Sequence, residues 1–338
     1  MLDRYSRQAR FWGIGPEGQD KIEGLSVAVI GMGALGSASA NLLVRAGVGR
    51  VRLIDRDIVE LSNLQRQVIY TEQDVDEALP KAVAAARHLA EANSNVTIEP
   101  VVADFNPANA LELLDGFDMA IDGADNFEVR YLANEVCVEL GIPFIYGGAI
   151  EGTGMVMPCV PGGPCFACLN GRDHAESSRP AKTCSTVGVL ASTTTMVAAL
   201  QCSLALKLAV GEQVDGRLVQ LDVWEGDFDA LEVEHDPDCP ICVHKRYRYL
   251  GHGDVGTRAD ASCGGNTVQV SPAKSRTVDL QEMAATLSAL GKAVAKDYYL
   301  DFKSPHASFI LFEDGRAIIR HVHDEGRAKS IYAEYIGL

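Results

Sequence analysis

Six residues near the N-terminus have the spacing of a phosphate-binding loop. The run Gly31-Met32-Gly33-Ala34-Leu35-Gly36 fits G-x-G-x-x-G and lies between a predicted strand and a predicted helix. Glycines allow the backbone to approach a phosphate, and the start of a helix offers free N–H groups. Asp55 ends the next predicted strand, where a carboxylate can accept hydrogen bonds from ribose hydroxyls. These two features predict a nucleotide site, and by themselves they leave an NAD-dependent oxidoreductase open.

A second group of side chains favours a triphosphate over NAD. The run Ser62-Asn63-Leu64-Gln65-Arg66-Gln67 follows Asp55 closely, and Lys81 begins a predicted helix. Arg66 and Lys81 would bring two cations towards the phosphates. Asp125, just after another predicted strand, would supply an oxygen ligand for Mg²⁺. The alternative is that these charges are ordinary solvated surface.

Four cysteines form two C-x-x-C pairs, which are Cys165 with Cys168 and Cys239 with Cys242. Four thiolates match a closed tetrahedral zinc site. The gap between the pairs is longer than in a zinc ribbon, so two separate redox pairs remain the alternative. The loop-rich sequence around each pair favours a metal that stabilises it.

Cys184 lies outside both pairs, in a stretch rich in Ser, Thr and Gly that follows Arg172, Arg179 and Lys182. Nearby cations favour the thiolate form of a cysteine, which is the nucleophilic form. The alternative is an ordinary small residue at the start of a helix.

The order of apolar runs predicts the elements that hold these residues. Strand and helix patterns alternate through the first half of the chain, which predicts an α/β, Rossmann-like, mostly parallel sheet with helices on both faces. Residues 152–188 read as long loops. The expected strands are 27–30, 51–54, 96–102, 119–121, 143–146 and 219–223, and the expected helices are 34–46, 81–92, 130–140 and 189–210.

Five glycines between residues 251 and 265 indicate a linker, so three segments are expected. They are an ATP-binding domain with the cysteine pairs over 1–248, a linker over 249–265, and a small α+β module over 266–338. The module should contain a hairpin turn at Asp314-Gly315. Its expected strands lie near 268–270 and over 298–302, 308–312 and 317–320, and its expected helices over 280–290 and 325–336.

Composition limits the possible partners and compartment. The 338 residues contain 30 Lys and Arg against 46 Asp and Glu, so the net charge is 30 − 46 = −16. Nucleic acid and anionic membrane surfaces need an excess of cations, so neither is expected as a partner. The longest apolar stretch, 187–210, is broken by polar residues and predicts a buried helix. The N-terminus lacks the apolar core of a signal peptide, which favours the cytoplasm.

Taken together, these motifs resemble the ThiF/MoeB/HesA family, bacterial relatives of ubiquitin-activating enzymes. The resemblance is continuous over residues 1 to about 248, and the tail is similar to the extension of a ThiF-type subset. The matching stretches are Arg4-Tyr5-Ser6-Arg7-Gln8, the glycine loop, Asp55-Arg56-Asp57, residues 62–67, Lys81, residues 122–130, both cysteine pairs, Cys184-Ser185-Thr186-Val187-Gly188, Cys263-Gly264 and Asp314-Gly315-Arg316-Ala317.

The resemblance implies an adenylyltransferase that uses ATP and Mg²⁺ to activate the C-terminal glycine of a ubiquitin-like sulfur carrier. It implies that Arg7 reaches the neighbouring subunit's site, so the enzyme would be a homodimer. It also implies a structural zinc on the four paired cysteines and a covalent role for Cys184. The expected catalytic residues are Arg7, Arg66, Lys81, Asp125 and Cys184, and the expected nucleotide contacts are Gly31, Gly33, Ala34, Gly36, Asp55, Asp57, Ser62, Asn63, Leu64, Gln65, Arg66, Lys81, Asp125 and Asn126.

The carrier implied by this resemblance ends in Gly-Gly and serves thiamine, molybdopterin or tRNA thiolation. The ThiF-like tail favours thiamine, and sulfur is expected from a separate donor protein. Two other functions stay open, an NAD-dependent oxidoreductase and an adenylating relative that acts on a peptide or a tRNA.

Overall fold

The structure is a computed structural model that describes residues 4–170, 187–251, 258–261, 267–272 and 277–337. The chain divides into two compact units, Met1–Gly251 and His252–Leu338. The division lies within the linker expected over 249–265. Each unit is described separately below.

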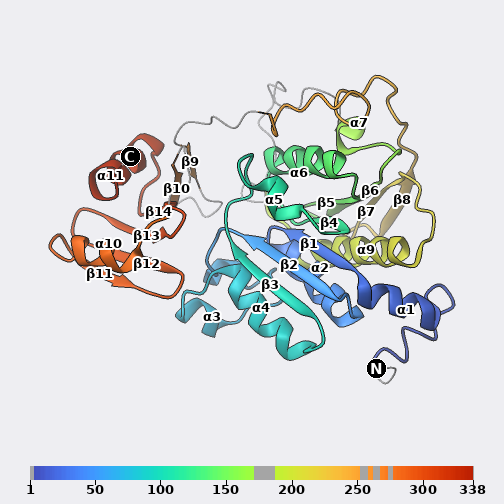
Figure 1. The fold of residues 1–338 in the computed structure, drawn as a ribbon, viewed down its shortest axis with the longest axis horizontal. Coiled ribbons are helices and arrows are strands. Elements are labelled where there is room, and N and C mark those ends of the chain that lie inside the picture. Colours follow the sequence, from blue (N-terminus) through green and yellow to red (C-terminus); the bar gives the residue numbers. More distant parts are fainter. Residues whose placement is uncertain (1–3, 171–186, 252–257, 262–266, 273–276, 338) are drawn as a thin grey trace. The chain divides into compact units, whose positions relative to one another are not determined.

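The first unit is built on an eight-stranded sheet in the order β3-β2-β1-β4-β5-β6-β7-β8 (Figure 1). Strands β1 to β5 are mutually parallel, and β6, β7 and β8 extend the sheet in antiparallel fashion. The strands are β1 Ser26–Ile30, β2 Arg50–Asp55, β3 Thr97–Val102, β4 Met119–Asp122, β5 Phe144–Ile150, β6 Thr153–Cys159, β7 Leu218–Asp222 and β8 Asp227–Leu231.

Helices cover both faces of this sheet. Figure 1 shows α5 and α6 on one side and α2, α4 and α9 on the other. Alternate residues of β1 divide between the two cores, because Val29 packs with the α2 side and Ile30 with the α6 side. The helices of the unit are α1 Gly15–Gly24, α2 Ala34–Ala46, η1 Leu61–Asn63, α3 Glu72–Asp76, α4 Lys81–Ala92, α5 Ala110–Leu114, α6 Phe127–Leu140, α7 Phe166–Asn170 and α9 Ala191–Val210.

Helix α9 is the one described helix that is long and apolar enough to cross a membrane. It packs against α2, β5 and β6. Gln201 of this helix donates from Nε2 to the carbonyls of Asp122 (2.8 Å) and Ile145 (3.1 Å), and its Oε1 accepts from Ser39 Oγ at 2.9 Å. These buried bonds join α9 to the sheet and to α2, as expected for a core helix.

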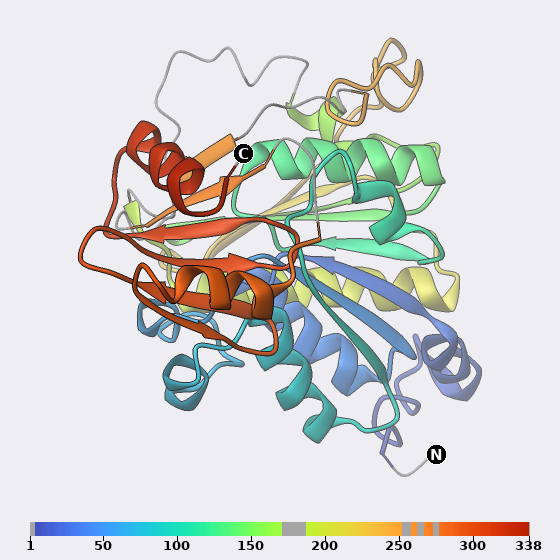
Figure 2. The ribbon, with the colours of Figure 1, turned by 60° about the vertical axis from the view of Figure 1, so that its left-hand side comes forward.

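The second unit is a six-stranded antiparallel sheet in the order β11-β12-β13-β14-β10-β9, shown in orange and red in Figure 2. Helices α10 and α11 contribute to one apolar core with the sheet, in which Phe302, Phe309 and Tyr332 are fully buried. Its elements are β9 Arg258–Ala261, β10 Thr267–Ser271, α10 Leu280–Leu287, β11 Lys292–Ala295, β12 Tyr299–Lys303, β13 Ser308–Phe312, β14 Ala317–Arg320 and α11 Glu325–Tyr335.

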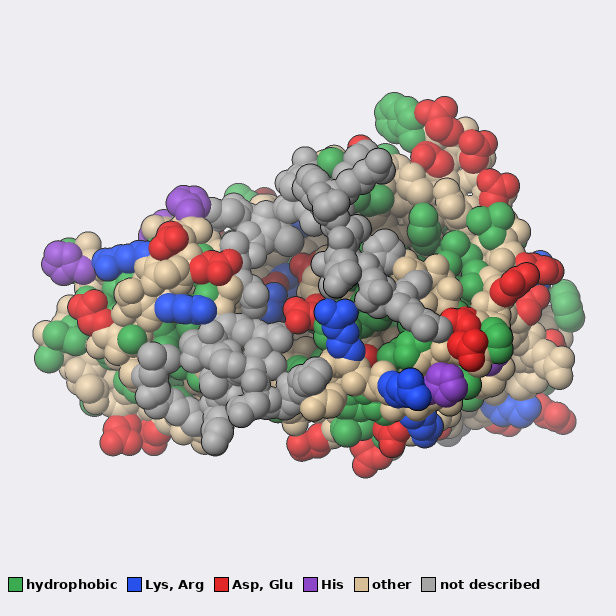
Figure 3. Space-filling model, turned by 90° about the horizontal axis from the view of Figure 1, so that it is seen from above, with side chains coloured by type: hydrophobic (Ala, Val, Ile, Leu, Met, Phe, Trp, Pro, Cys, Tyr) green, Lys and Arg blue, Asp and Glu red, His purple; other side chains and the backbone are tan. Residues whose placement is uncertain are grey.

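The predicted fold class is confirmed, and one local expectation is wrong. Residues 152–188 were expected to be loops, but β6 Thr153–Cys159 pairs on both sides in the sheet and α7 Phe166–Asn170 is helical. The glycine and proline within β6 are uncommon in strand interiors, so the sequence pattern did not predict a strand there. Acidic side chains are spread over the face shown in Figure 3, in keeping with the net charge of −16.

Candidate functional site

The glycine loop lies at the carboxyl edge of the parallel strands. Ile30, the last residue of β1, is level with Ile54 of β2 and with Asp122 of β4. The loop that follows β1 therefore lies between the ends of β2 and β4. In an open α/β sheet this is the point where the strand order reverses and where ligands bind.

Two glycines of the loop are required by packing, and one faces open space. Gly31 has φ +88°, and a Cβ there would lie 2.6 Å from the carbonyl oxygen of Gly123. A Cβ on Gly36 would overlap the carbonyl of Gly31. No atom lies within 4 Å of a Cβ built on Gly33, which precedes α2 and provides no side-chain cap. The N–H groups at the start of α2 are thus accessible to an anion.

Asp55 is buried directly beneath this loop. Its Oδ2 accepts the N–H of Met32 at 2.6 Å, and its Oδ1 accepts the N–H of Asp57 at 2.7 Å. Burial raises the pKa of Asp55, and the ammonium of Lys81 acts against that rise. Tyr70 also holds the loop, because its hydroxyl donates to the Met32 carbonyl at 2.7 Å.

Lys81 is a buried cation of the site. Its Nζ lies 2.9 Å from Oδ2 of Asp57, and its side chain is 9% exposed against 44% for Asp57. Burial lowers the pKa of Lys81, but the carboxylates of Asp57 and Asp55 outweigh burial and hold it above its ordinary value. Asp125 also acts on Lys81 electrostatically, so the structure brings these carboxylates and the lysine together.

The 62–67 run is a turn that follows β2 in the chain and begins within η1. Asn63 is buried and its Oδ1 accepts from the N–H of Glu60 at 3.2 Å, which shapes the turn. Arg66 is half-buried, and its guanidinium donates to the Ser62 carbonyl at 3.0 Å rather than to a residue of the glycine loop. Ser62 and Gln65 are exposed, and Leu64 is half-buried.

Asp125 is presented by a loop that a buried ion pair holds. Arg130 Nε lies 2.9 Å from Oδ2 of Asp122, and Arg130 Nη2 donates to the Ala124 carbonyl at 2.7 Å. Burial raises the pKa of Asp122, and the charge of Arg130 opposes that rise. Asp125 itself is exposed, and Asn126 caps α6 by accepting the N–H of Val129. Neither Asp122 nor Arg130 was predicted as a site residue.

Arg7 is anchored far from the glycine loop of its own chain. Tyr5 is buried and accepts from Asn93 Nδ2 at 2.8 Å, and Gln8 donates to the Ala46 carbonyl at 2.8 Å. These anchors contact the C-terminal ends of α2 and α4, whereas the site lies at their N-terminal ends. A helix of 12 residues such as α4 is about 18 Å long. The structure does not bring Arg7 to the site.

The four paired cysteines converge into one cluster rather than two separate pairs. Their sulfur atoms all lie within 4.8 Å of one another. Individual separations are 3.7 Å for Cys165–Cys239, 3.9 Å for Cys165–Cys168 and 3.6 Å for Cys168–Cys242. Tetrahedral zinc with Zn–S bonds of about 2.3 Å needs sulfur separations of about 3.8 Å. The cluster is therefore compatible with zinc.

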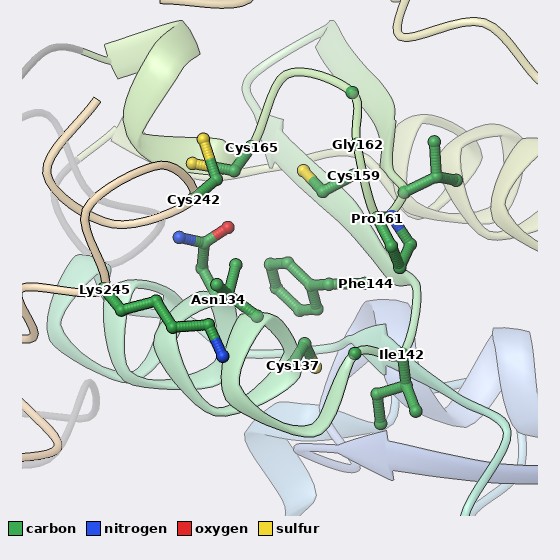
Figure 4. Close-up of a pocket in the computed structure, with 14 residues that line it drawn as sticks. Asn134, Cys137, Ile142, Phe144, Cys159, Pro161, Gly162, Cys165, Cys242 and Lys245 are labelled. Carbon is green, nitrogen blue, oxygen red and sulfur yellow. The ribbon is translucent and has the colours of Figure 1, made fainter. Parts of the chain in front are cut away.

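The remaining cysteines differ from this cluster. Cys137 of α6 (Figure 4) and Cys202 of α9 are buried, and burial raises the pKa of Cys137 and brings that of Cys202 to about 12. Such thiols stay neutral and unreactive. Cys184, together with the cations expected near it, lies outside the described residues.

The fold and this edge of the sheet define a nucleotide-binding α/β protein with a tetracysteine centre. Comparison with known families matches residues 5–241 to the ThiF family. The chain belongs to that family, which confirms the predicted family.

Two relatives and one solved structure are similar to this chain. It is 42% identical over 342 residues to the "Sulfur carrier protein ThiS adenylyltransferase" of Bacillus subtilis, with all of both chains covered. It is 39% identical over 246 residues to the "SAMP-activating enzyme E1" of Haloferax volcanii, covering 72% of this chain and 89% of the relative. The "Crystal structure of E. coli MccB + ATP" superposes with a TM-score of 0.62 at 26% identity, covering 71% of this chain and 74% of that one.

Proposed function

We propose that this chain adenylates the C-terminal glycine of a small ubiquitin-like sulfur carrier that ends in Gly-Gly, and releases pyrophosphate from ATP. The observation that carries this proposal is the meeting of the glycine loop, Asp55, Lys81 and Asp125 at one edge of the sheet. The names of the B. subtilis and H. volcanii relatives support the same activity. The cytoplasm is the compartment we propose.

Each residue type has a part in that reaction. The N–H groups at the start of α2 and the cations Arg66 and Lys81 bind the phosphates, and Asp55 holds the ribose. Asp125 would hold Mg²⁺, which supplies charge neutralisation at the phosphate oxygens. The other expected contacts would also line the nucleotide site. They come from Asp57, from the 62–67 run and from Asn126.

The chemical step needs positioning more than proton transfer. The carrier carboxylate is already an anion, so it attacks the α-phosphorus without a general base, and the bond to pyrophosphate breaks. Arg66 and Lys81 neutralise charge that develops on the phosphate oxygens. Because Lys81 is paired with Asp57 at 2.9 Å, its ammonium is held in place before the nucleotide arrives.

Arg7 is proposed to act on the site of a second subunit in a homodimer. Its anchors hold it at the opposite edge of its own sheet, so it cannot serve its own glycine loop without leaving them. Phe11 and Trp12 follow it and are 52% and 89% exposed, which gives apolar surface for a second copy to cover. The site would then be complete only in the dimer.

Zinc is the metal we propose for the tetracysteine cluster, held by Cys165, Cys168, Cys239 and Cys242. All four ligands are thiolates, so the site is closed and structural rather than catalytic. The 1–248 segment would carry adenylation. A separate protein would donate the sulfur.

Exchange of labelled pyrophosphate into ATP tests the function. We expect exchange that requires a carrier ending in Gly-Gly and that Asp125→Ala abolishes, because a lost metal carboxylate costs several kcal/mol of transition-state stabilisation. Asp115→Ala is the matched control, since it removes an exposed carboxylate at the end of α5. An NAD-dependent oxidoreductase would show no exchange, and full activity of the Asp125 variant would refute the assignment.

Mixed dimers test the role of Arg7. Arg7→Ala and Asp125→Ala chains are each expected to be inactive alone. If Arg7 acts across the interface, a mixed dimer contains one site with both residues intact, so activity returns on mixing. No return of activity would place Arg7 in its own subunit's site or outside catalysis.

A further inference from the structure

Three successive backbone groups of the glycine loop are bonded to β2 and to the segment after it. The N–H of Gly31 donates to the carbonyl of Ile54 at 2.8 Å, and the N–H of Met32 donates to Oδ2 of Asp55 at 2.6 Å. The carbonyl of Met32 accepts from the hydroxyl of Tyr70 at 2.7 Å. Of the two side chains that make these bonds, only that of Tyr70 has no part in the proposed reaction.

The bond from Tyr70 sets the direction of the next N–H group of the loop. The peptide between Met32 and Gly33 is trans, so its C=O and its N–H point in opposite directions. Because the carbonyl of Met32 points to Tyr70, the N–H of Gly33 points away from it. Gly33 is half-buried, and no atom lies within 4 Å of a Cβ built there. The loop is thus open at this residue, and its N–H is held in one direction at the start of α2.

Tyr70 is itself held by the helix that carries Lys81. It is 7% exposed, and its hydroxyl also lies 3.3 Å from the carbonyl of Lys81, the first residue of α4. The N–H of Thr71 donates to Oδ2 of Asp74 at 2.7 Å, and Nε2 of His88 in α4 lies 2.8 Å from the same oxygen. The phenol therefore joins the glycine loop to α4.

The hydroxyl is the part of Tyr70 that packing does not require, because a phenylalanine would bury the same ring. Burial and the charges of Asp55 and Asp74 raise the pKa of Tyr70 well above its ordinary value. The phenol therefore keeps its proton at neutral pH and donates it to the loop. Met32 is fully buried, so solvent does not reach its carbonyl in place of the hydroxyl.

We propose that Tyr70 is a positioning residue for the nucleotide, whose hydroxyl turns the peptide between Met32 and Gly33 so that the N–H of Gly33 faces a phosphate of ATP. This role rests on the nucleotide site of the proposed function. Without the hydroxyl the peptide can rotate, and nucleotide binding must then supply the order that Tyr70 supplies in the free protein. The phosphates lose affinity, whereas the nucleoside held by Asp55 does not.

Tyr70→Phe removes the hydroxyl and keeps the ring. Binding of α,β-methylene-ATP with Mg²⁺ to the full chain can be measured by calorimetry, and binding of adenosine by NMR titration. We expect the variant to bind the ATP analogue about tenfold more weakly, the effect of one hydrogen bond, and adenosine within about twofold of the wild type. 4-Aminophenylalanine at position 70 restores a donor and should restore the affinity.

Pyrophosphate exchange gives a second readout of the same variant. The phosphate contact exists both before and during the reaction, so Tyr70→Phe should raise the KM for ATP and change kcat little. A fall in kcat at an unchanged KM would overturn the proposal.

Tyr332→Phe is the matched control. Tyr332 is fully buried in the second unit, and its hydroxyl donates to the carbonyl of Gly315 at 2.7 Å. The control therefore loses the same kind of bond at another turn and should bind the ATP analogue as the wild type does. Unchanged binding of the analogue by Tyr70→Phe, an equal loss for adenosine, or the same loss in Tyr332→Phe would overturn the proposal.

The wild type separates this proposal from the adenylation reaction. Binding of the ATP analogue without pyrophosphate exchange would overturn adenylation alone and leave the role of Tyr70 intact. Failure of the wild type to bind the analogue would overturn both.

Discussion

The nucleotide edge and the tetracysteine cluster lie in the same unit but are stabilised in different ways. At the nucleotide edge, charged side chains are held in buried ion pairs, such as Asp122 with Arg130, that leave Asp125 exposed and ready for a ligand. At the cluster, four thiols meet from segments 74 residues apart, with only short helical or irregular structure around them. The comparison shows that one region is preorganised by its own side chains, whereas the other would depend on the zinc that we propose for it.

Loss of one buried cysteine ligand should abolish zinc binding by the cluster. Cys239 is 1% exposed, and Cys239→Ser should remove bound zinc and lower the melting temperature strongly, because metal binding is part of the folding free energy of such sites. We expect about one zinc per wild-type chain by metal analysis, and a chelator should reproduce the variant's loss of stability. A zinc-free wild-type protein with both pairs oxidised would contradict this.

The nucleotide edge should instead respond to the loss of a charge. Arg130→Met leaves Asp122 buried and unpaired, and should lower the free energy of unfolding by about 3–5 kcal/mol in urea titrations. Arg87→Met is the matched control, because Arg87 pairs with Glu77 at the surface with 53% and 40% exposure. Loss of an exposed pair costs about 1 kcal/mol or less. Similar losses for the two variants would remove the difference between the regions.

A smaller effect is expected at the rim of the cluster. His235 Nε2 lies 3.4 Å from the sulfur of half-buried Cys242, so an N–H donor can stabilise the thiolate there. His235→Ala should speed zinc transfer to a chelator about tenfold, and His235→Gln should restore the slow rate. His244→Ala, in the same segment, should change little. Equal rates in all variants would show that His235 does not support the metal.

The smallest effect on adenylation is expected at Cys184. Adenylation needs no thiol, so Cys184→Ala should leave pyrophosphate exchange unchanged. A later attack on the acyl-adenylate would use a thiolate, and the variant should then form less thiocarboxylate or carrier adduct. Mass spectrometry of the carrier after incubation with a sulfur donor measures this. Equal thiocarboxylate yields would make Cys184 a bystander.

The sequence predicted those parts of the molecule whose signals are local. The glycine loop, Asp55 and Lys81 follow fixed spacings from strand to helix, so they could be placed on one sheet edge before the structure was known. The convergence of the cysteine pairs was expected from the chemistry of four thiols, with the separate-pair alternative left open. In both cases short motifs carry the information.

Other features depend on packing between distant segments. Glu135 is fully buried in α6, and its carboxylate accepts the N–H groups of Arg248, Tyr249 and Leu250 at 2.8–2.9 Å. No sequence motif predicts these bonds. Tyr70 acts in the same way, because its hydroxyl donates to the carbonyl of Met32, 38 residues earlier in the chain. Strand β8 has five exposed residues and no buried face, so apolar alternation could not reveal it.

We propose that the preorganised edge of the sheet activates a carrier carboxylate with ATP. The most direct test of this proposal is pyrophosphate exchange with a carrier that ends in Gly-Gly and with the same carrier lacking its last glycine. We expect rapid exchange with the complete carrier and a rate near background with the shortened one, because the terminal carboxylate is the attacking group. Exchange that proceeds equally with either carrier, or with neither, would show that the terminal carboxylate of the carrier is not the group that this enzyme activates.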